Sequence, residues 1–464
     1  MSSYHVLGVT TIWCFSVCML SLHGVASPTE TCVCLKNETS GLYNPIHIEF
    51  RGDRYYIAEQ RGIVRYFETR DKQAHVLLNI SDKVVLTASP ADQRGLLGFT
   101  LHPRYNTNGR LYVYYIGNSS GLQFSYVSEF TVVDDVALPA TERILLRIEQ
   151  ITNAGNAGQL LFGHDGYLYI SVGDGVGDDG IPRDHAQDPT SLLGKILRVD
   201  VDGQSFMGGA ALRYGIPANN PFVDKSPWRP EVFAYGCRNM WRCSQDRVAD
   251  KDGERRIFCG DPGARTSEEI DVILSGRNYG WNIKEGNDCF DSSKCGNVTI
   301  ENEALPIYVY RHTNLFHAVV GGYVYRGKTL PDLYGRYLYG DAMTGNISAL
   351  SEGHGGWTSS PLPVCDQQQC PCDAREQPRD FLLTFGQDEQ GEVYILTTSS
   401  ITAFKDDGVA LKIVPSLGEK SVTCGCNRRG ESLGVVVLVT LMMSILTGYA
   451  SLRVEDVDTE DLVY

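Results

Sequence analysis

The sequence predicts an all-β fold: a six-bladed β-propeller, stapled by disulfide bonds and followed by a single C-terminal transmembrane helix. Three observations predict this class. The chain of 464 residues contains 48 glycines and 25 tyrosines and has few long amphipathic runs, which favours strands joined by many turns. A strand motif with a central aromatic residue recurs six times, and the cysteines that follow the N-terminal apolar segment are even in number.

The N-terminal region is typical of an exported protein. An apolar run over residues 6–22 is followed by the small residues Gly24 and Ala26. This pattern predicts a secretory signal peptide over residues 1–26. A cysteine-bearing segment, residues 27–40, comes next.

A short alternating strand centred on an aromatic residue recurs through the middle of the chain. The six central residues are Tyr56, Tyr112, Tyr169, Phe258, Tyr339 and Tyr394. A four-stranded propeller blade needs about 50 residues, so each repeat predicts one blade and the wider gaps contain insertions. Turn dipeptides such as Asp165-Gly166 separate the strands. We therefore expect one closed propeller over residues 41–415, since a β-sandwich, the alternative, rarely repeats one motif six times.

The C-terminal region predicts membrane attachment. After a stalk at residues 416–432, residues 433–452 carry no charge, and a helix of about 20 residues spans a bilayer. The acidic tail at residues 453–464 favours a spanning helix over a GPI lipid anchor, the alternative. The expected location is the cell membrane, with type I orientation and the propeller outside.

Cysteine usage agrees with export. Cys14 and Cys18 leave with the predicted signal peptide, and the rest predict a disulfide framework. Its members are Cys32, Cys34, Cys237, Cys243, Cys259, Cys289, Cys295, Cys365, Cys370, Cys372, Cys424 and Cys426. Cys289 and Cys295 are close enough for a local pair, and the first two and last two members would join the ends of the domain. A zinc site is the alternative, but no histidine stands at ligand spacing beside a cysteine pair.

Glycosylation sequons and net charge narrow the possible partners. Sequons begin at Asn37, Asn79, Asn118, Asn297 and Asn346, which supports a luminal or extracellular location. The formal charge of −15 excludes a general nucleic-acid binder, because such a protein needs a basic face. This charge suits a basic protein partner or a cation, and it also fits an ordinary acidic ectodomain.

Residues 153–203 carry the most specific motifs. They begin NAGNAGQLLFGHDGYLYISVGDG and end LLGKILRVDVDG. Further motifs lie at Gly95–Pro103, Tyr214–Phe222, Tyr235–Cys243, Phe258–Gly263, Asn278–Asn282, Gly321–Gly327 and Phe385–Asp388. Together they resemble the glucose/sorbosone dehydrogenase superfamily of β-propellers, and more closely its Hedgehog-interacting-protein-like branch.

The resemblance implies a reaction for the family, and this chain lacks the residue expected to act as its base. The bacterial quinoproteins oxidise sugar alcohols with pyrroloquinoline quinone (PQQ) and Ca²⁺, and their base is a histidine in a His-x-Gly-Gly pattern. The matching position here is Gly155. Neither Asn156 nor Gln159 replaces the base, because an amide has no useful protonation equilibrium near neutral pH. Loss of a general base typically costs about 10²- to 10⁴-fold in rate.

Three other residues are candidates for the site. Arg238 and Asn239 match the family's Tyr-Gly-x-Arg-Asn motif, so the resemblance implies that they bind the cofactor. The alternative for Arg238 is a structural bond to carbonyls at strand ends. His164 lies near the expected base position in sequence and is a candidate catalytic residue, or else a solvated histidine in a hairpin turn. The other histidines, including His312 and His317, show no partner pattern.

A glycine-rich acidic loop follows the signature strand. Oxygen-rich loops of this kind suit Ca²⁺, although the spacing is not that of an EF-hand. The candidate ligands are Asp174, Asp178, Asp179 and Asp184. In the Hedgehog-interacting protein an equivalent acidic loop reaches the zinc-containing cleft of Hedgehog, so the resemblance implies a similar contact here. A further acidic run, Glu268-Glu269-Ile270-Asp271, lies where family enzymes bind calcium through backbone oxygens.

The leading hypothesis is a cell-surface glycoprotein of the Hedgehog-interacting-protein-like group. It would bind an extracellular protein ligand or a glycan and would have lost the catalytic base. Two alternatives remain: a PQQ-dependent sugar or polyol oxidoreductase that uses another base, and a carbohydrate or matrix adhesion module. Fold similarity alone does not choose among them.

Overall fold

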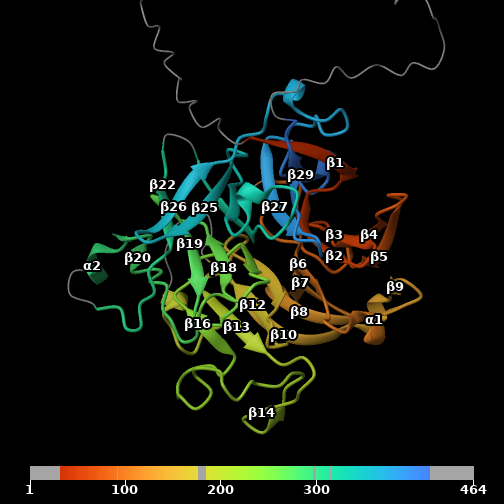
Figure 1. Cartoon of the computed structure of the whole chain (residues 1–464). Coiled ribbons are helices and arrows are strands. Elements are labelled where there is room, and N and C mark those ends of the chain that lie inside the picture. Colours follow the sequence, from red (N-terminus) through yellow and green to blue (C-terminus); the bar gives the residue numbers. More distant parts are fainter. Residues whose placement is uncertain (1–31, 91, 176–183, 296–298, 314–315, 418–464) are drawn as a thin grey trace, which may run out of the picture. The chain divides into compact units, whose positions relative to one another are not determined.

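The structure is a computed structural model that describes residues 32–90, 92–175, 184–295, 299–313 and 316–417 (Figure 1). The predicted signal peptide, spanning helix and acidic tail lie outside these residues, as do Cys424, Cys426 and Asn297. No helix within the described ranges is long and apolar enough to cross a membrane.

The first three blades are four-stranded antiparallel sheets that follow one another along the chain. Blade 1 contains β2 (Pro45–Arg51), β3 (Arg54–Glu59), β4 (Ile63–Glu68) and β5 (Ala74–Asn79). Blade 2 contains β6 (Leu96–Leu101), β7 (Arg110–Ser119), β8 (Leu122–Val133) and β10 (Arg143–Gln150). Blade 3 contains β11 (Ala157–Phe162), β12 (Leu168–Val172), β13 (Lys195–Val199) and β16 (Val232–Tyr235).

The last three blades have the same form, but the sixth takes one strand from the N-terminal region. Blade 4 contains β17 (Arg242–Gln245), β18 (Ile257–Asp261), β19 (Ser267–Ile273) and β22 (Tyr308–Arg311). Blade 5 contains β23 (Val319–Val324), β24 (Tyr337–Asp341), β25 (Ile347–Gly353) and β26 (Gly356–Pro361). Blade 6 contains β27 (Phe381–Gln387), β28 (Val393–Thr398), β29 (Gly408–Pro415) and β1 (Val33–Leu42).

Short elements fill the insertions between these strands. The short strands are β9 (Val136–Ala137), which bridges β5 and β8, the hairpin of β14 (Phe206–Met207) and β15 (Ala210–Ala211), and the hairpin of β20 (Lys284–Glu285) and β21 (Asp288–Cys289). The helical turns are α1 (Tyr105–Asn108), α2 (Ser292–Cys295) and the 3₁₀ turns Pro139–Thr141, Asp184–Ala186, Pro331–Leu333 and Gln367–Gln369.

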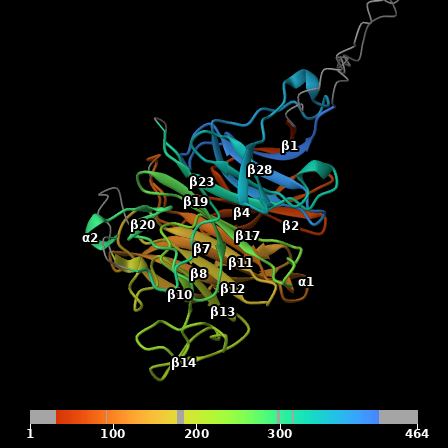
Figure 2. The same cartoon turned by 60° about the vertical axis from the view of Figure 1, so that its left-hand side comes forward.

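The six sheets close into a ring, as Figures 1 and 2 show. The first strand of each blade contacts the first strand of the next, and the cycle is completed where β27 contacts β2. β1 pairs with β29 at the outer edge of blade 6, with Val33 opposite Pro415. The N-terminal segment is therefore part of the propeller, which begins before residue 41, the boundary that the sequence predicted. The all-β propeller fold itself is confirmed.

The aromatic repeat identifies the same strand in every blade. Each of the six central aromatics lies in the second strand, in β3, β7, β12, β18, β24 and β28. These strands pack between neighbouring blades, and every residue of β12 and β24 is buried. A strand covered on both faces needs apolar residues at nearly every position, which explains why this strand left the clearest pattern.

The disulfides confirm part of the expected framework. Cys289 pairs with Cys295 as expected, and Cys243 pairs with Cys259 across β17 and β18. Cys372 is also disulfide-bonded. Cys237 is buried and takes part in no disulfide, so its assignment to the framework was wrong. It lies just before β17 and packs into the apolar cluster between blades 3 and 4, where burial raises the pKa of its thiol.

The two N-terminal cysteines have different partners from those expected. Cys32 pairs with Cys365 and Cys34 pairs with Cys370, so neither bonds to the C-terminal cysteines. Both bridges attach β1 to the segment between β26 and β27. They reinforce the point at which the ring closes.

Candidate functional site

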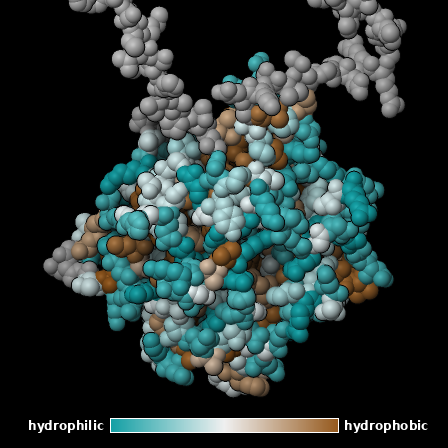
Figure 3. Space-filling view, in the orientation of Figure 1, coloured by the Kyte–Doolittle hydropathy of each residue, from teal (hydrophilic) through white to brown (hydrophobic). Residues whose placement is uncertain are grey.

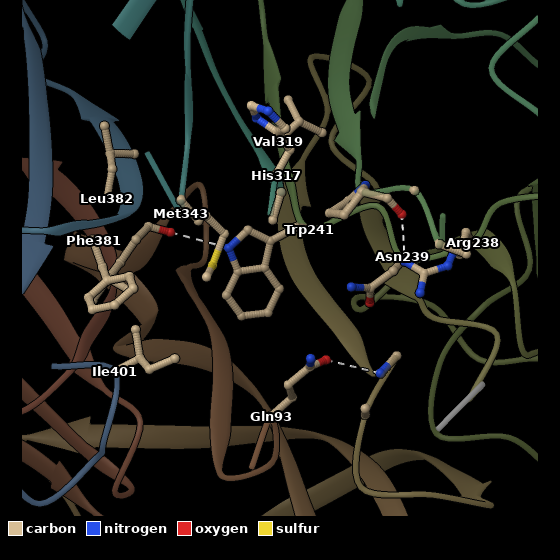
Figure 4. A pocket seen from close by; sticks show the side chains of 18 of the residues that line it. Gln93, Arg238, Asn239, Trp241, His317, Val319, Met343, Phe381, Leu382 and Ile401 are labelled. Carbon is tan, nitrogen blue, oxygen red and sulfur yellow. Dashed lines mark hydrogen bonds between the residues drawn. The ribbon is translucent and has the colours of Figure 1, made fainter. Parts of the chain in front are cut away.

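A cavity of about 510 Å³ lies at the end of the ring where the innermost strands begin (Figure 4). We call it the axial pocket. Every blade contributes to its wall at or just before its first strand, through Asn44, Gln93, Gly155, Arg238, His317 and Phe381. The closed ring therefore shapes the cavity, and these six contributions come from positions far apart in sequence.

Arg238 presents a partly unsatisfied guanidinium to the axial pocket. Its Nη1 donates to the Pro262 carbonyl at 2.6 Å, and its backbone N–H donates to Asp261 at 2.8 Å. The Nε atom is buried and has no hydrogen-bond partner among the described residues. The structural interpretation of Arg238 is confirmed by its bond to the Pro262 carbonyl, and the ligand-binding interpretation stays a prediction.

Asn239 has a mainly structural position in the same wall. Its backbone N–H donates to Asp261 Oδ1 at 2.5 Å, and its side-chain Oδ1 accepts the N–H of Ala157 at 2.7 Å. These bonds connect the start of blade 4 to the start of blade 3. The expected cofactor-binding pair is therefore brought to one pocket, but the Asn239 oxygen is already used.

Gly155, which the family resemblance matched to the base position, lies in the wall of the axial pocket. It is buried, and its N–H donates to the Gln93 side chain at 3.1 Å. Its φ angle is +66°, in the left-handed region that favours glycine. The wall therefore offers only backbone atoms at this point.

Two tryptophans give the axial pocket apolar surface that the sequence did not single out. Trp281 Nε1 donates to Asp174 at 2.5 Å, and the Arg238 guanidinium lies 5.5 Å from the Trp281 ring centre. Trp241 Nε1 donates to the Leu383 carbonyl at 3.2 Å. Because their polar N–H groups are satisfied, the rings are held in fixed orientations and present flat apolar faces.

His164 does not belong to this site. It lies in the exposed turn after β11, whereas Gly155 precedes β11. A six-residue strand separates them, a length of about 20 Å. His164 lines a second cavity of about 490 Å³ at the other end of the innermost strands, so its candidacy as the catalytic base was wrong.

The described residues of the acidic loop do not gather into a metal site. Asp174 is buried beside Trp281, while Asp184 is exposed and forms an ion pair with Lys294. Asp178 and Asp179 lie outside the described residues.

A different group of carboxylates could hold a cation. Carboxylate oxygens of Asp261, Glu269 and Asp271 all lie within 4.8 Å of one another, and all three residues are buried. Asp261 and Glu269 are opposite one another in the β18–β19 ladder, and Glu269 and Asp271 are two residues apart, so the three side chains share one face. Both carboxylate oxygens of Asp271 lack a hydrogen-bond partner in the described part of the chain.

The pKa values of these three carboxyl groups also indicate that a bound cation would stabilise their ionised forms. Burial raises the pKa of Asp261 to about 7 and raises the pKa values of Glu269 and Asp271 well above their usual range. Repulsion from Asp261 adds to the effect at Glu269 and Asp271, and repulsion from Asp174 adds to it at Asp261. Without a cation, this group must hold protons; an ion such as Ca²⁺ would replace them, because it binds ionised carboxylates. The donor set therefore fits a cation such as Ca²⁺.

The fold and this pocket define a class: a six-bladed propeller with a ligand-sized cavity on its axis. The chain belongs to the glucose/sorbosone dehydrogenase family, because the family model described as Glucose / Sorbosone dehydrogenase matches residues 42–400. The resemblance drawn from the sequence motifs is thereby confirmed.

Curated relatives place the chain beside the Hedgehog-interacting-protein-like proteins. It is 32% identical to the human Hedgehog-interacting protein, over 83% of this chain and 53% of that protein. It is 28% identical to the HIPL1 protein of Arabidopsis thaliana, over 90% of this chain and 71% of that protein. The chain thus spans about half the length of the Hedgehog-interacting protein.

Solved structures confirm the fold. The apo-form aldose sugar dehydrogenase of Escherichia coli matches with a TM-score of 0.63 and 21% identity, over 82% of this chain and 99% of that one. The PQQ-bound aldose sugar dehydrogenase of Streptomyces coelicolor matches with a TM-score of 0.57 and 19% identity, over 84% of this chain and 99% of that one.

Proposed function

We propose that this protein is an extracellular binding propeller of the Hedgehog-interacting-protein-like group, and that part of its ligand occupies the axial pocket. The observation that carries the proposal is Arg238, a cation that lines a cavity with tryptophan walls. Such a site favours an organic ligand with an anionic or strongly accepting group. The wall at Gly155 supplies no side chain for general base catalysis, which supports binding rather than turnover.

A thermal-shift measurement tests this proposal. The probe is D-glucuronate, which has both a carboxylate and a sugar ring. We expect it to raise the melting temperature of the purified protein, because a ligand that binds only the folded state stabilises it. Arg238→Gln should remove the shift, whereas Arg255→Gln, in the cavity at the opposite end, should keep it. A shift that is absent in the native protein, or unchanged in Arg238→Gln, would contradict the proposal.

A dye-reduction assay tests the oxidoreductase alternative. The protein is supplied with PQQ and Ca²⁺ across a panel of sugars, with the E. coli aldose sugar dehydrogenase as positive control. We expect no turnover above the protein-free background. Turnover that is lost in Arg238→Gln would overturn the binding proposal in favour of an enzyme.

We also propose that the Asp261–Glu269–Asp271 carboxylates hold Ca²⁺. Calcium should then raise the melting temperature and EGTA should lower it; at a free calcium concentration 100 times the Kd the gain is about 2.7 kcal/mol. Asp271→Asn should abolish this dependence. Asp184→Asn is the matched control from the acidic loop and should leave it intact. If Asp184→Asn abolished the calcium dependence and Asp271→Asn kept it, the ion would instead lie in the acidic loop.

The extracellular location rests on export signals and on surface chemistry. Asn79, Asn118 and Asn346 are exposed and Asn37 is half-buried, so the described sequons are accessible to glycosylation. The face that Figure 3 shows is largely hydrophilic, with only small apolar groups, as suits a hydrated ectodomain. Endoglycosidase treatment of protein from secretory cells should lower its apparent mass; an unchanged mass would contradict export.

The proposed partner is an extracellular protein ligand of Hedgehog type, on the strength of the similarity to the Hedgehog-interacting proteins. Titration of the protein with Hedgehog at low and moderate salt tests this. Binding that weakens with salt would support an acidic contact surface. An absence of binding at both salt concentrations would exclude this partner and leave a glycan as the remaining candidate.

A further inference from the structure

A histidine that the sequence left unplaced lines the axial pocket. His317 precedes β23, and its side chain is 13% exposed. Figure 4 shows it beside Val319 and far across the pocket from Gln93, which bonds to Gly155. It therefore belongs to the wall contributed by blade 5, whereas the family's base position belongs to blade 3.

Asp341 fixes the orientation of this imidazole. The His317 Nδ1 atom is 3.1 Å from Asp341 Oδ2. Asp341 ends β24, and its two oxygens also accept hydrogen bonds from the Tyr310 hydroxyl at 2.8 Å and from the backbone N–H groups of Met343 and Thr344 at 3.0 Å each. A carboxylate held by so many donors has little freedom to move, so the ring that it contacts is held in place too.

The same contact defines the tautomer of His317. A carboxylate accepts hydrogen bonds, so Nδ1 is the nitrogen that carries the proton toward Asp341; in the neutral ring Nε2 is then the acceptor. The hydroxyl of Thr313 lies 3.1 Å from Nε2. Nε2 thus already has a hydroxyl at hydrogen-bond distance, and a ligand hydroxyl bound there would take the place of the Thr313 hydroxyl.

A second histidine and a tyrosine pack against this imidazole. His312 lies with its ring centre 5.9 Å from that of His317, and its Nε2 is 2.5 Å from Glu268. This bond to Glu268 raises the pKa of His312. The Tyr310 ring packs edge-on against the His317 ring, with 5.8 Å between the ring centres.

We propose that His317, oriented by Asp341, accepts a hydrogen bond from a hydroxyl group of the ligand in the axial pocket. This inference rests on the proposed function and adds a second anchor to it. Arg238 on blade 4 binds the anionic or carbonyl end of the ligand, and His317 on blade 5 selects a ligand that also carries a hydroxyl. The ligand class is then a hydroxylated organic acid, or a chain end with the same groups.

Two probes separate this inference from the proposed function. D-glucuronate carries a carboxylate and free hydroxyls, whereas its per-O-methylated form keeps the carboxylate but has no hydroxyl to donate. We expect glucuronate to bind about tenfold more tightly, since one hydrogen bond is worth up to about a factor of ten in affinity. Nitrogen NMR of the histidine rings should show the His317 Nε2 signal shifting with glucuronate and not with the methylated probe.

Substitutions at position 317 distinguish an acceptor from a shape-filling residue. His317→Leu removes the acceptor and should erase the preference for glucuronate over the methylated probe. His317→Gln keeps an acceptor oxygen at a similar distance along the side chain and should retain most of the preference. His164→Leu, in the exposed turn at the other end of the ring, is the matched control and should bind as the native protein does.

Each outcome decides between the two proposals. If both probes bind equally and Arg238→Gln weakens both, the pocket is a ligand site and the role of His317 is refuted. If neither probe binds the native protein, the proposed function fails, and the inference that rests on it fails as well. A preference for glucuronate that survives in His317→Leu also refutes the inference.

Discussion

Gly155 has a backbone conformation that disfavours any residue with a side chain. With φ at +66°, it occupies a conformation that costs an L-amino acid about 1–2 kcal/mol. Its N–H is also committed to Gln93. If the proposed loss of the base is correct, the local backbone opposes its reversal by a single substitution.

The variant Gly155→His tests this conclusion. We expect it to lower the free energy of unfolding by about 1–2 kcal/mol and to restore no PQQ-dependent dye reduction. Gly355→His is the control, because Gly355 has open space around it and no positive φ, so that variant should be near neutral. Urea unfolding gives the stabilities. A Gly155→His protein that is as stable as the native one, or that reduces the dye, would contradict this account.

Glu49 should make the free energy of unfolding depend on pH. It lies in the second cavity, and burial raises its pKa from 4.5 to about 7. Between these two values the native state holds a proton that the unfolded state has released, so the free energy of unfolding falls as pH rises through this window. The full effect is at most about 3 kcal/mol, because one pKa unit corresponds to about 1.4 kcal/mol.

The matching experiment is urea unfolding of Glu49→Gln from pH 4.5 to pH 8. The variant should lack the component of the pH slope that arises from Glu49 and should be relatively more stable at pH 8. Glu68→Gln, which removes a carboxylate that is 39% exposed, should keep the native slope. An identical slope in Glu49→Gln and the native protein would show that Glu49 titrates normally.

Among the elements, β1 is the one whose place the sequence predicted least well. The sequence pattern suggested a segment outside the propeller. The hydrogen bonds that make β1 a strand are formed with β29, which lies at the far end of the described chain. Local pattern cannot reveal such a pairing. The second strands, by contrast, were found correctly because burial between blades imposes an apolar pattern on each strand separately.

The disulfides at β1 should contribute non-additively to stability. Cys32–Cys365 and Cys34–Cys370 close loops of 333 and 336 residues, so either one alone supplies nearly all of the loop-closure entropy. We expect Cys32→Ser with Cys365→Ser to cost about 1–2 kcal/mol, and removal of both bridges to cost about 5 kcal/mol or more. Calorimetry of the single and double removals checks this. If the two losses were additive, the explanation that both bridges close nearly the same loop would be wrong.

The site could be predicted only where its residues carry a family motif. Arg238, Asn239 and Gly155 were placed in one pocket because their motifs recur in the family, and the structure brings them together. His164 was misplaced because closeness in sequence is not closeness in space when a strand lies between.

The sequence did not reveal the groups of residues that are brought together by strand pairing or by packing. The Asp261–Glu269–Asp271 group depends on the pairing of β18 with β19, although the alternation of Glu269 and Asp271 was a usable signal once β19 was recognised as a strand. His317 and Asp341 lie 24 residues apart and meet only because blade 5 folds them to the same end. Their pairing has no local sequence signature.

At the scale of the whole molecule, the ring is closed by contacts and not by chain continuity. Val33 and Pro415 are partners in the β1–β29 ladder, so the two ends of the described propeller lie within about 5 Å of one another. A circular permutant that joins residue 417 to residue 32 by a short linker, with new ends between Asp252 and Gly253, should therefore keep all six blades. The new ends fall in an exposed turn that connects β17 to β18.

We expect this permutant to melt within a few degrees of the propeller with its natural ends and to keep the Arg238-dependent thermal shift with D-glucuronate. Deletion of β1 is the opposite test. It removes Val33, Leu35 and Leu42, each at most 1% exposed, for a loss of about 5–9 kcal/mol, and it leaves β29 as an unpaired edge. Since a domain of this kind is stable by about 5–15 kcal/mol, the deletion should unfold or aggregate. A stable deletion protein alongside an unfolded permutant would show that chain order, and not closure by β1, holds the ring together.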